Sequence, residues 1–269
     1  MNTITSRDNP KLKHARKVRD GKTPDEIFLE GLRLAEEALR SNVDVNSAFI
    51  SSNFGQHTRE AEFVRGLEDR DISLFAVDDK LFQSIADTKN SQGVILICRR
   101  PHTSFSHFEN RGTENADSLA IFLNRINNPS NLGAILRTAE AAGVANVIVS
   151  DNSADVFTPK SLRASMGSGL RLNIWENAAF DDVIGWAGEH GLETTTADTG
   201  AERDYTDVGW KTPRLLVFGS EADGLTADEL AKIEEAIKIP MENDVESLNL
   251  AVSCGIILFE AKRQRDLTG

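Results

Sequence analysis

Hydrophobic positions along the chain follow a helical spacing in some segments and form short continuous runs in others. Over the first 100 residues, the helical spacing predicts helices at 9–19, 32–42, 59–70 and 79–88. The apolar runs between them predict strands at 26–31, 45–51, 73–77 and 93–100. This alternation predicts a small α/β domain over residues 1–100.

A polar stretch without periodicity separates this first pattern from a second one. It contains Pro101 and Gly112 and predicts a linker over residues 101–117. Beyond it, longer apolar runs predict strands at 119–124, 146–151, 171–176, 193–198, 215–220 and 236–241. Helical patterns between these runs include those at 160–167, 180–191 and 227–235. Nearly continuous apolar strands that alternate with helices predict a mostly parallel sheet covered on both faces, in a second domain over residues 118–269.

Composition narrows the class of protein. Of the 269 residues, 40% are hydrophobic and 27% are charged, which is typical of a globular chain. No apolar run reaches the roughly 18 residues that a membrane-spanning helix needs, and the N-terminus lacks the apolar segment of a signal peptide. Cys98 and Cys254 form no disulfide or zinc pattern, and the five histidines lack metal-ligand spacing. We therefore expect a cytoplasmic protein without a bound metal.

Charge is distributed unevenly along the sequence. The net charge of −12 argues against an anionic partner for the whole surface, but the first 22 residues carry seven Lys or Arg residues against two Asp. Such a basic arm can bind a nucleic-acid backbone, although a solvated helix face would have the same composition. Candidate backbone contacts, in the arm and beyond it, are Lys11, Lys13, Arg16, Lys17, Arg125, Lys160, Arg163 and Arg171.

Two polar loops follow predicted strands of the second domain, at the strand ends where parallel sheets bind ligands. In the first, NNPSN, Asn131 or Ser130 is placed to cap the next helix, which carries Arg137 further on. The second, FGSEADGL, places Glu221 between Gly219 and Gly224, which permit a close backbone approach or a positive φ. Each loop also has a purely structural interpretation, as a helix cap and a glycine turn.

A third polar loop follows the strand that ends near Ile239 and leads into a long helix over 246–265. Ser247 is the expected N-cap, so Asn249 falls in the first turn, where an amide has no structural role. Gly255 is expected to allow close helix packing. The expected buried stripe of this helix consists of Leu248, Ala251, Val252, Gly255, Ile256 and Phe259.

The three loops together resemble the motifs of the SpoU/TrmH-type RNA ribose 2′-O-methyltransferases of the SPOUT class. The matching segments, in the family's order and spacing, are NPSNLGAILRTAEAAG, LLVFGSEADGL and IPMENDVESLNLAVSCGIILFE. Ser220 and Ala222 stand where the family often has Asn and Gly. The segments NPKLKHARKVR and FLEGLRLAEEAL are similar to the small L30e-like RNA substrate-binding domain often fused ahead of that catalytic unit.

The resemblance implies a fold and an activity that no periodicity indicates. It implies a trefoil-knotted α/β catalytic domain that forms a homodimer through the knot region and the C-terminal helix. It also implies transfer of a methyl group from S-adenosylmethionine to a ribose 2′-hydroxyl, with ribosomal RNA favoured and transfer RNA as the alternative. The cofactor would contact mostly backbone in the neighbourhoods of Gly219, Ile239 and Leu248.

The family's polar site corresponds here to Asn131, Arg137, Glu221, Ser247 and Asn249. Arg137 is expected either to accept the proton of the ribose hydroxyl or to hold the adjacent phosphate and stabilise the developing alkoxide. Asn131 would orient Arg137, and the other three would position the nucleotide or hold the loops. The RNA backbone would contact Lys11, Lys13, Arg16, Lys17 and Arg163.

Two other classes of protein remain as alternatives. One is a catalytically idle RNA-binding relative, which the presence of all five polar residues disfavours. The other is a dehydrogenase-type nucleotide-binding protein, which the missing glycine fingerprint after the strand at 119–124 disfavours.

Overall fold

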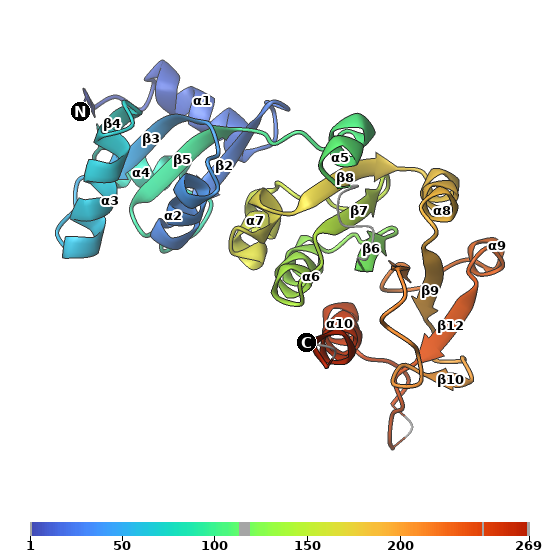
Figure 1. The fold of residues 1–269 in the computed structure, drawn as a ribbon. Helices are drawn as coiled ribbons and strands as arrows, with labels where there is room; N and C mark the ends of the chain where they lie inside the picture. The colour runs from blue at the N-terminus through green and yellow to red at the C-terminus, as the bar shows by residue number, and fades with distance from the viewer. Residues whose placement is uncertain (1, 113–118, 244, 268–269) are drawn as a thin grey trace. The chain divides into compact units, whose positions relative to one another are not determined.

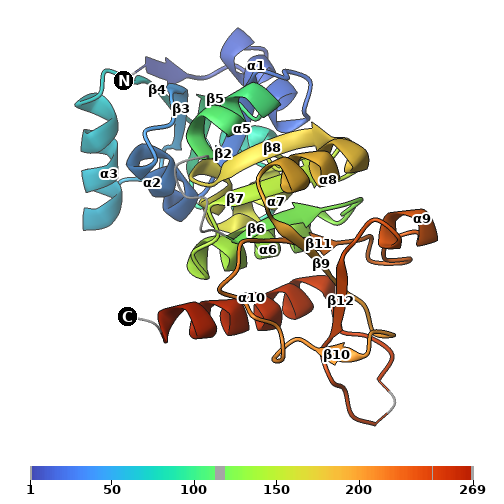
Figure 2. The same ribbon diagram turned by 45° about the vertical axis from the view of Figure 1, so that its right-hand side comes forward.

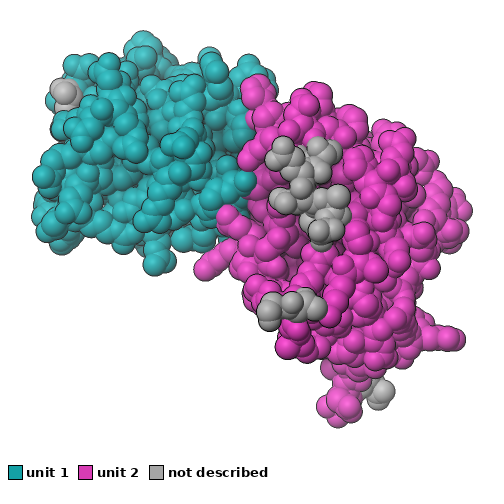
Figure 3. Space-filling model, in the orientation of Figure 1, with its two compact units in different colours: residues 1–101, 156–171 teal, residues 102–155, 172–269 magenta. Residues whose placement is uncertain are grey.

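The computed structural model describes residues 2–112, 119–243 and 245–267 (Figure 1). The chain forms two compact units, which Figure 3 distinguishes by colour. Unit 1 contains residues 1–101 and 156–171, and unit 2 contains residues 102–155 and 172–269.

Unit 1 is built on a five-stranded mixed sheet with the strand order β1-β4-β3-β5-β2. Strands β1, β4 and β3 run parallel, whereas β5 is antiparallel to both β3 and β2. The strands are β1 (Asn2–Ile4), β2 (Glu26–Glu30), β3 (Val45–Ser51), β4 (Ser73–Val77) and β5 (Val94–Arg99). The helices between them are α1 (Pro10–Arg19), α2 (Leu32–Arg40), α3 (Thr58–Glu68) and α4 (Asp79–Ile85). All predicted elements of this region are confirmed, and β1 is additional.

One segment of the predicted second domain packs with unit 1. It contains α7 (Pro159–Ser165) and the short 3-10 helix η2 (Ser168–Leu170). Ion pairs attach it to unit 1, Arg163 with Asp87 at 2.6 Å and Arg171 with Glu37 at 2.7 Å. Both pairs join residues more than 70 positions apart, which is why the sequence pattern did not place this segment with unit 1.

Unit 2 is built on a seven-stranded sheet in which every strand pair is parallel, so the expected mostly parallel α/β fold is confirmed. The strand order is β10-β12-β9-β11-β6-β7-β8. The strands are β6 (Leu119–Leu123), β7 (Asn146–Ser150), β8 (Asn173–Ala178), β9 (Glu193–Ala197), β10 (Arg203–Asp204), β11 (Arg214–Phe218) and β12 (Glu235–Lys238). The carboxyl ends of these strands therefore meet at one edge of the sheet.

Helices cover both faces of this sheet, as Figures 1 and 2 show. They are α5 (Phe105–Gly112), α6 (Pro129–Ala141), α8 (Phe180–Glu189), α9 (Ala227–Leu230) and α10 (Leu250–Asp266). Phe108 of α5 and Trp186 of α8 share one buried cluster with Ala120 and Phe122 of β6. Because side chains alternate along a strand, Ile121 of β6 faces the opposite side, where α10 packs beside α6.

Two stretches of unit 2 differ from their sequence predictions. The linker expected at 101–117 contains α5, because Phe108 is buried against Trp175 and Trp186; residues 113–117 lie outside the described residues. The helix expected at 227–235 ends at Leu230, and its last expected residue is the first of β12.

Candidate active site

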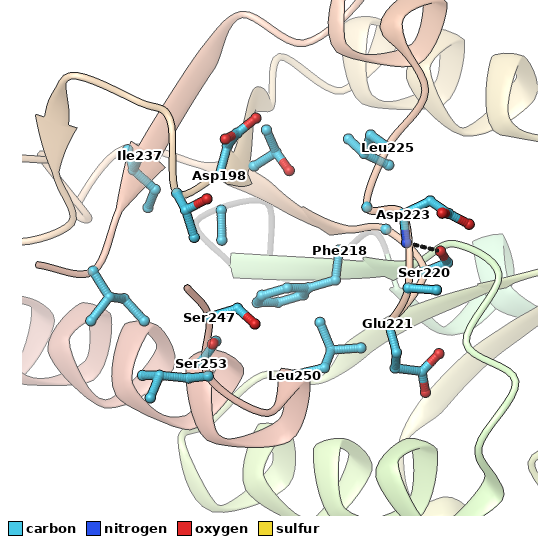
Figure 4. A pocket seen from close by; sticks show the side chains of 18 of the residues that line it. Asp198, Phe218, Ser220, Glu221, Asp223, Leu225, Ile237, Ser247, Leu250 and Ser253 are labelled. Atoms are coloured by element: carbon cyan, nitrogen blue, oxygen red, sulfur yellow. Dashed lines mark hydrogen bonds between the residues drawn. The ribbon is translucent and has the colours of Figure 1, made fainter. Parts of the chain in front are cut away.

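A cavity of about 430 Å³ opens at the carboxyl edge of the unit 2 sheet (Figure 4). Its walls are the segments that follow β9, β11 and β12, closed on one side by the start of α10. Its volume lies in the range of small-molecule sites. Five residues selected from the sequence line it, namely Gly219, Glu221, Ile239, Ser247 and Leu248.

The loop after β11 folds back on itself so tightly that its first glycine is required. The amide of Ser220 donates to the carbonyl of Gly224 at 3.1 Å, and the amide of Gly224 donates back to Ser220 at 3.0 Å. A Cβ on Gly219 would lie 2.2 Å from the carbonyl carbon of Gly224. Gly224 itself has φ +66°, which a glycine adopts without strain. The loop therefore presents backbone rather than side chain to the cavity at this point.

A chain of hydrogen bonds joins the three polar loops beside the cavity. The Asn131 amide donates to the Glu221 carboxylate at 3.3 Å, and the Asn249 amide donates to the Asn131 side-chain oxygen at 3.3 Å. The backbone amides of Asn127 and Asn128 also point at Glu221, each at 3.4 Å. The structure thus places together three residues that lie 90 and 118 positions apart in the sequence.

The caps of the two adjoining helices differ from the prediction. Asn128, rather than Asn131 or Ser130, caps α6 by accepting from the Ser130 amide at 2.9 Å. Asn249, rather than Ser247, caps α10 by accepting from the Ala251 amide at 3.0 Å. Asn249 therefore has a structural role that the sequence prediction denied it, in addition to its bond with Asn131.

Arg137 lies apart from the cavity lining. It is exposed on α6, and within the described ranges its guanidinium makes no hydrogen bond or ion pair. It follows Asn131 by six residues, about 9 Å along a helix axis. Its charge is thus available to a ligand that approaches α6 from solvent.

The buried stripe predicted for α10 is wrong. The buried apolar residues of this helix are Cys254, Ile257, Leu258 and Ala261. Val252 and Phe259 are half exposed, with 50% and 49% of their surface accessible, and Leu248 is 36% exposed. The helix carries apolar residues on two faces, and only one of them packs within the chain. Gly255 faces Thr138 of α6, but a Cβ there would meet the Thr138 methyl group at an ordinary 3.5 Å, so the packing does not require a glycine.

The predicted RNA contacts fall into two groups. Lys17 is exposed without a side-chain partner among the described residues, and Lys13 is exposed but pairs with Asp8 at 2.9 Å. The others are engaged within unit 1: Lys11 lies over the Phe75 ring, Arg16 bonds Ser84 and the carbonyl of Arg7, and Arg163 pairs with Asp87. Arg125, Lys160 and Arg171 were also candidates; Arg125 is bound to Glu229 and Arg171 to Glu37.

The cavity lining is acidic, and the sequence prediction named only one of its three carboxylates, Glu221. Asp198, Glu221 and Asp223 line it, whereas none of the lining residues that the structure describes is Lys, Arg or His. Asp198 follows β9 just as Glu221 follows β11, so its place at the carboxyl end of a predicted strand was the signal that identifies it. Such a lining disfavours a polyphosphate ligand and favours one with cationic groups.

Comparison with known proteins identifies the family of this chain. Residues 118–259 match the family model described as the SpoU rRNA Methylase family, and residues 28–104 match that for RNA 2′-O ribose methyltransferase substrate binding. A Synechocystis protein named as a tRNA/rRNA methyltransferase is 29% identical over 98% of this chain and 94% of its own length. The Bacillus subtilis 23S rRNA (guanosine(2553)-2′-O)-methyltransferase RlmP is 26% identical over 97% of this chain and 100% of its own length.

Solved structures agree with the sequence matches. The AdoMet-bound rRNA methyltransferase from Sinorhizobium meliloti superposes with a TM-score of 0.84 at 27% identity, and covers 97% of both chains. An RNA 2′-O ribose methyltransferase superposes with a TM-score of 0.81 at 28% identity, over 98% of this chain and 99% of its own. Because the family model matches more than half of its length, this chain belongs to the SpoU rRNA methylase family.

Proposed function

We propose that the chain transfers a methyl group from S-adenosylmethionine to a ribose 2′-hydroxyl of RNA, with ribosomal RNA as the favoured substrate. The observation that carries the proposal is the convergence of Asn131, Glu221 and Asn249 beside a cavity at the carboxyl edge of a parallel sheet. Similarity to RlmP, which is named for a 23S rRNA guanosine, supports ribosomal over transfer RNA. The buried thiols of Cys98 and Cys254 are consistent with a cytoplasmic location.

The cavity fits the methyl donor in size, charge and wall chemistry. S-adenosylmethionine is a drug-sized molecule with a sulfonium and an ammonium group, which suit a lining of three carboxylates without a cation. The apolar side chains of Leu225, Ile239 and Leu248 provide a surface for a flat purine. The loop after β11 lines the cavity at Gly219 and Gly224 with backbone alone.

The donor supplies an electrophilic methyl group, and the chain supplies alignment and charge. Asn249 and Asn131 hold Glu221 at the rim, so the loop after β11 and the starts of α6 and α10 form one fixed edge. We assign to Arg137, which is exposed on α6, the role of holding a phosphate next to the reacting ribose. Because arginine side chains retain their proton in proteins, we assign it stabilisation of the developing alkoxide rather than removal of the hydroxyl proton.

We propose further that the catalytic unit is knotted and works as a homodimer. The chain passes from β12, beyond β9 in the sheet, to α10, which packs beside α6; this return across the strand ends supports a trefoil path. The half-exposed Val252 and Phe259 of α10 support a second copy as the partner of that face. An exposed apolar helix face is costly in water and is typical of an interface.

Methyl transfer is tested with the purified full chain, tritiated S-adenosylmethionine and ribosomal RNA, followed by mapping of 2′-O-methyl sites. Arg137→Ala should lower turnover about a hundredfold or more, the usual effect of removing one charge-stabilising donor, with little change in S-adenosylhomocysteine affinity. Arg137→Lys keeps the charge and should retain more activity than alanine. Near-normal turnover in Arg137→Ala would remove its proposed role, and a wild-type chain that methylates no RNA would overturn the function.

A further inference from the structure

The backbone of Arg125 has an unfavourable conformation for a residue other than glycine. It follows β6 by two residues and has φ +59°, in the left-handed region that residues other than glycine adopt at a cost of about 1 kcal/mol or more. Its amide donates to the Ser150 hydroxyl at 2.8 Å, which fixes the backbone there. We interpret this backbone strain as the consequence of directing the Arg125 side chain to one particular place.

The Arg125 side chain points toward the loop after β11. The Arg125 guanidinium forms a two-pronged pair with the Glu229 carboxylate, and its Nη2 also donates to the carbonyl of Gly224 at 3.2 Å. The Gly224 carbonyl is the same atom that accepts from the Ser220 amide and closes the loop. One side chain of the segment after β6 therefore holds the closing point of the loop that lines the cavity.

Glu229 is held from several directions, so it is a fixed anchor for this arginine. It accepts from Asn124 at 2.9 Å and from the Thr226 amide at 2.7 Å, as well as from Arg125. Its side chain is only 13% exposed. The hydrogen bonds from Arg125, the largest contribution, lower the pKa of Glu229 to about 2, so the carboxylate stays charged throughout the physiological range.

We propose that Arg125 is a positioning residue that fixes the loop of residues 219–225 in the shape that binds S-adenosylmethionine. It acts through Gly224 and Glu229 and does not line the cavity itself. The inference rests on the proposed function, because it assigns the cofactor to this cavity. It also replaces the RNA-backbone role that the sequence suggested for Arg125, whose donors are already engaged within unit 2.

The test compares Arg125→Gly, Arg125→Lys and Arg203→Ala with the wild-type full chain. Glycine removes the guanidinium but adopts positive φ freely, so the backbone strain is relieved and the fold is preserved. Arg203 is a matched control, because it also binds a carboxylate (Glu235) and a backbone carbonyl (Asp207), yet none of these three residues lines the cavity. Each protein is titrated with S-adenosylhomocysteine by calorimetry, and its thermal midpoint is measured.

Arg125→Gly should weaken S-adenosylhomocysteine binding about tenfold or more, whereas its thermal midpoint should fall only by a few degrees, because Glu229 loses its ion-pair partner while the backbone strain is relieved. In turnover assays the KM for S-adenosylmethionine should rise similarly, with kcat within about twofold. Lysine should restore part of the affinity, and Arg203→Ala should bind normally. Hydrogen exchange at Ser220 and Gly224 should accelerate in Arg125→Gly without any ligand. Unchanged affinity in Arg125→Gly overturns the positioning role alone, whereas a wild type that binds no S-adenosylhomocysteine overturns the proposed function itself.

Discussion

The substitution Gly219→Ala, which adds a single methyl group, tests the geometry of the cavity. In Gly219→Ala, the new Cβ would lie 2.2 Å from the carbonyl carbon of Gly224, 2.4 Å from its oxygen and 2.5 Å from the amide nitrogen of Leu225. Carbon atoms in contact normally lie about 3.5–4.0 Å apart. The loop must therefore open by roughly 1 Å, and all three obstacles are backbone atoms that cannot rotate away.

Forced overpacking of this kind costs about 1–3 kcal/mol. Because the displaced backbone lines the cavity, we expect most of this cost in cofactor affinity, where each 1.4 kcal/mol is about tenfold. Calorimetric titration with S-adenosylhomocysteine should thus give a dissociation constant raised about 5- to 150-fold. The chain should remain folded, with a thermal midpoint lowered by a few degrees.

Gly185→Ala is the matched control for this substitution. Gly185 is exposed within α8 and a Cβ there meets no atom within 4 Å. Alanine is the better helix former by up to about 1 kcal/mol, so this variant should be slightly more stable and bind the ligand normally. If Gly219→Ala bound S-adenosylhomocysteine within twofold of the wild type, the assignment of the cavity to this ligand would be refuted.

Three further outcomes are expected. Because the pKa of Glu229 is about 2, below its usual 4.5, its stabilising effect is full above pH 4.5 and disappears toward pH 2; the difference in thermal midpoint between wild type and Glu229→Gln should shrink over that range. RNA affinity should fall steeply with salt, and Lys17→Ala should lower the slope of log Kd against log salt by about 0.7–0.9, whereas an unchanged slope contradicts a phosphate contact. Phe259→Glu should convert the proposed homodimer to a monomer, as measured by sedimentation velocity. A wild-type chain that sediments as a monomer would contradict the proposed homodimer.

Local pattern was sufficient for most of the architecture. Apolar runs and helical spacing predicted most of the elements of both units, because strands and amphipathic helices repeat at periods set by backbone geometry alone. The same rule located much of the site: loops that follow parallel strands share one sheet edge, so Glu221 and Asn249 were expected near Asn131. The cavity also contains Asp198, which the same reasoning applied to β9 would have included.

Where one local pattern allowed two arrangements, only the tertiary structure decided between them. Helix α10 carries apolar residues on two faces, so its periodicity could not tell the buried Ile257 from the half-exposed Phe259. Neighbouring polar residues compete equally for a cap, and packing selected Asn128 and Asn249. Arg125 looked like a free surface cation because its partner Glu229 lies 104 positions away. Contacts at such separations depend on how the whole sheet assembles, and no local periodicity encodes them.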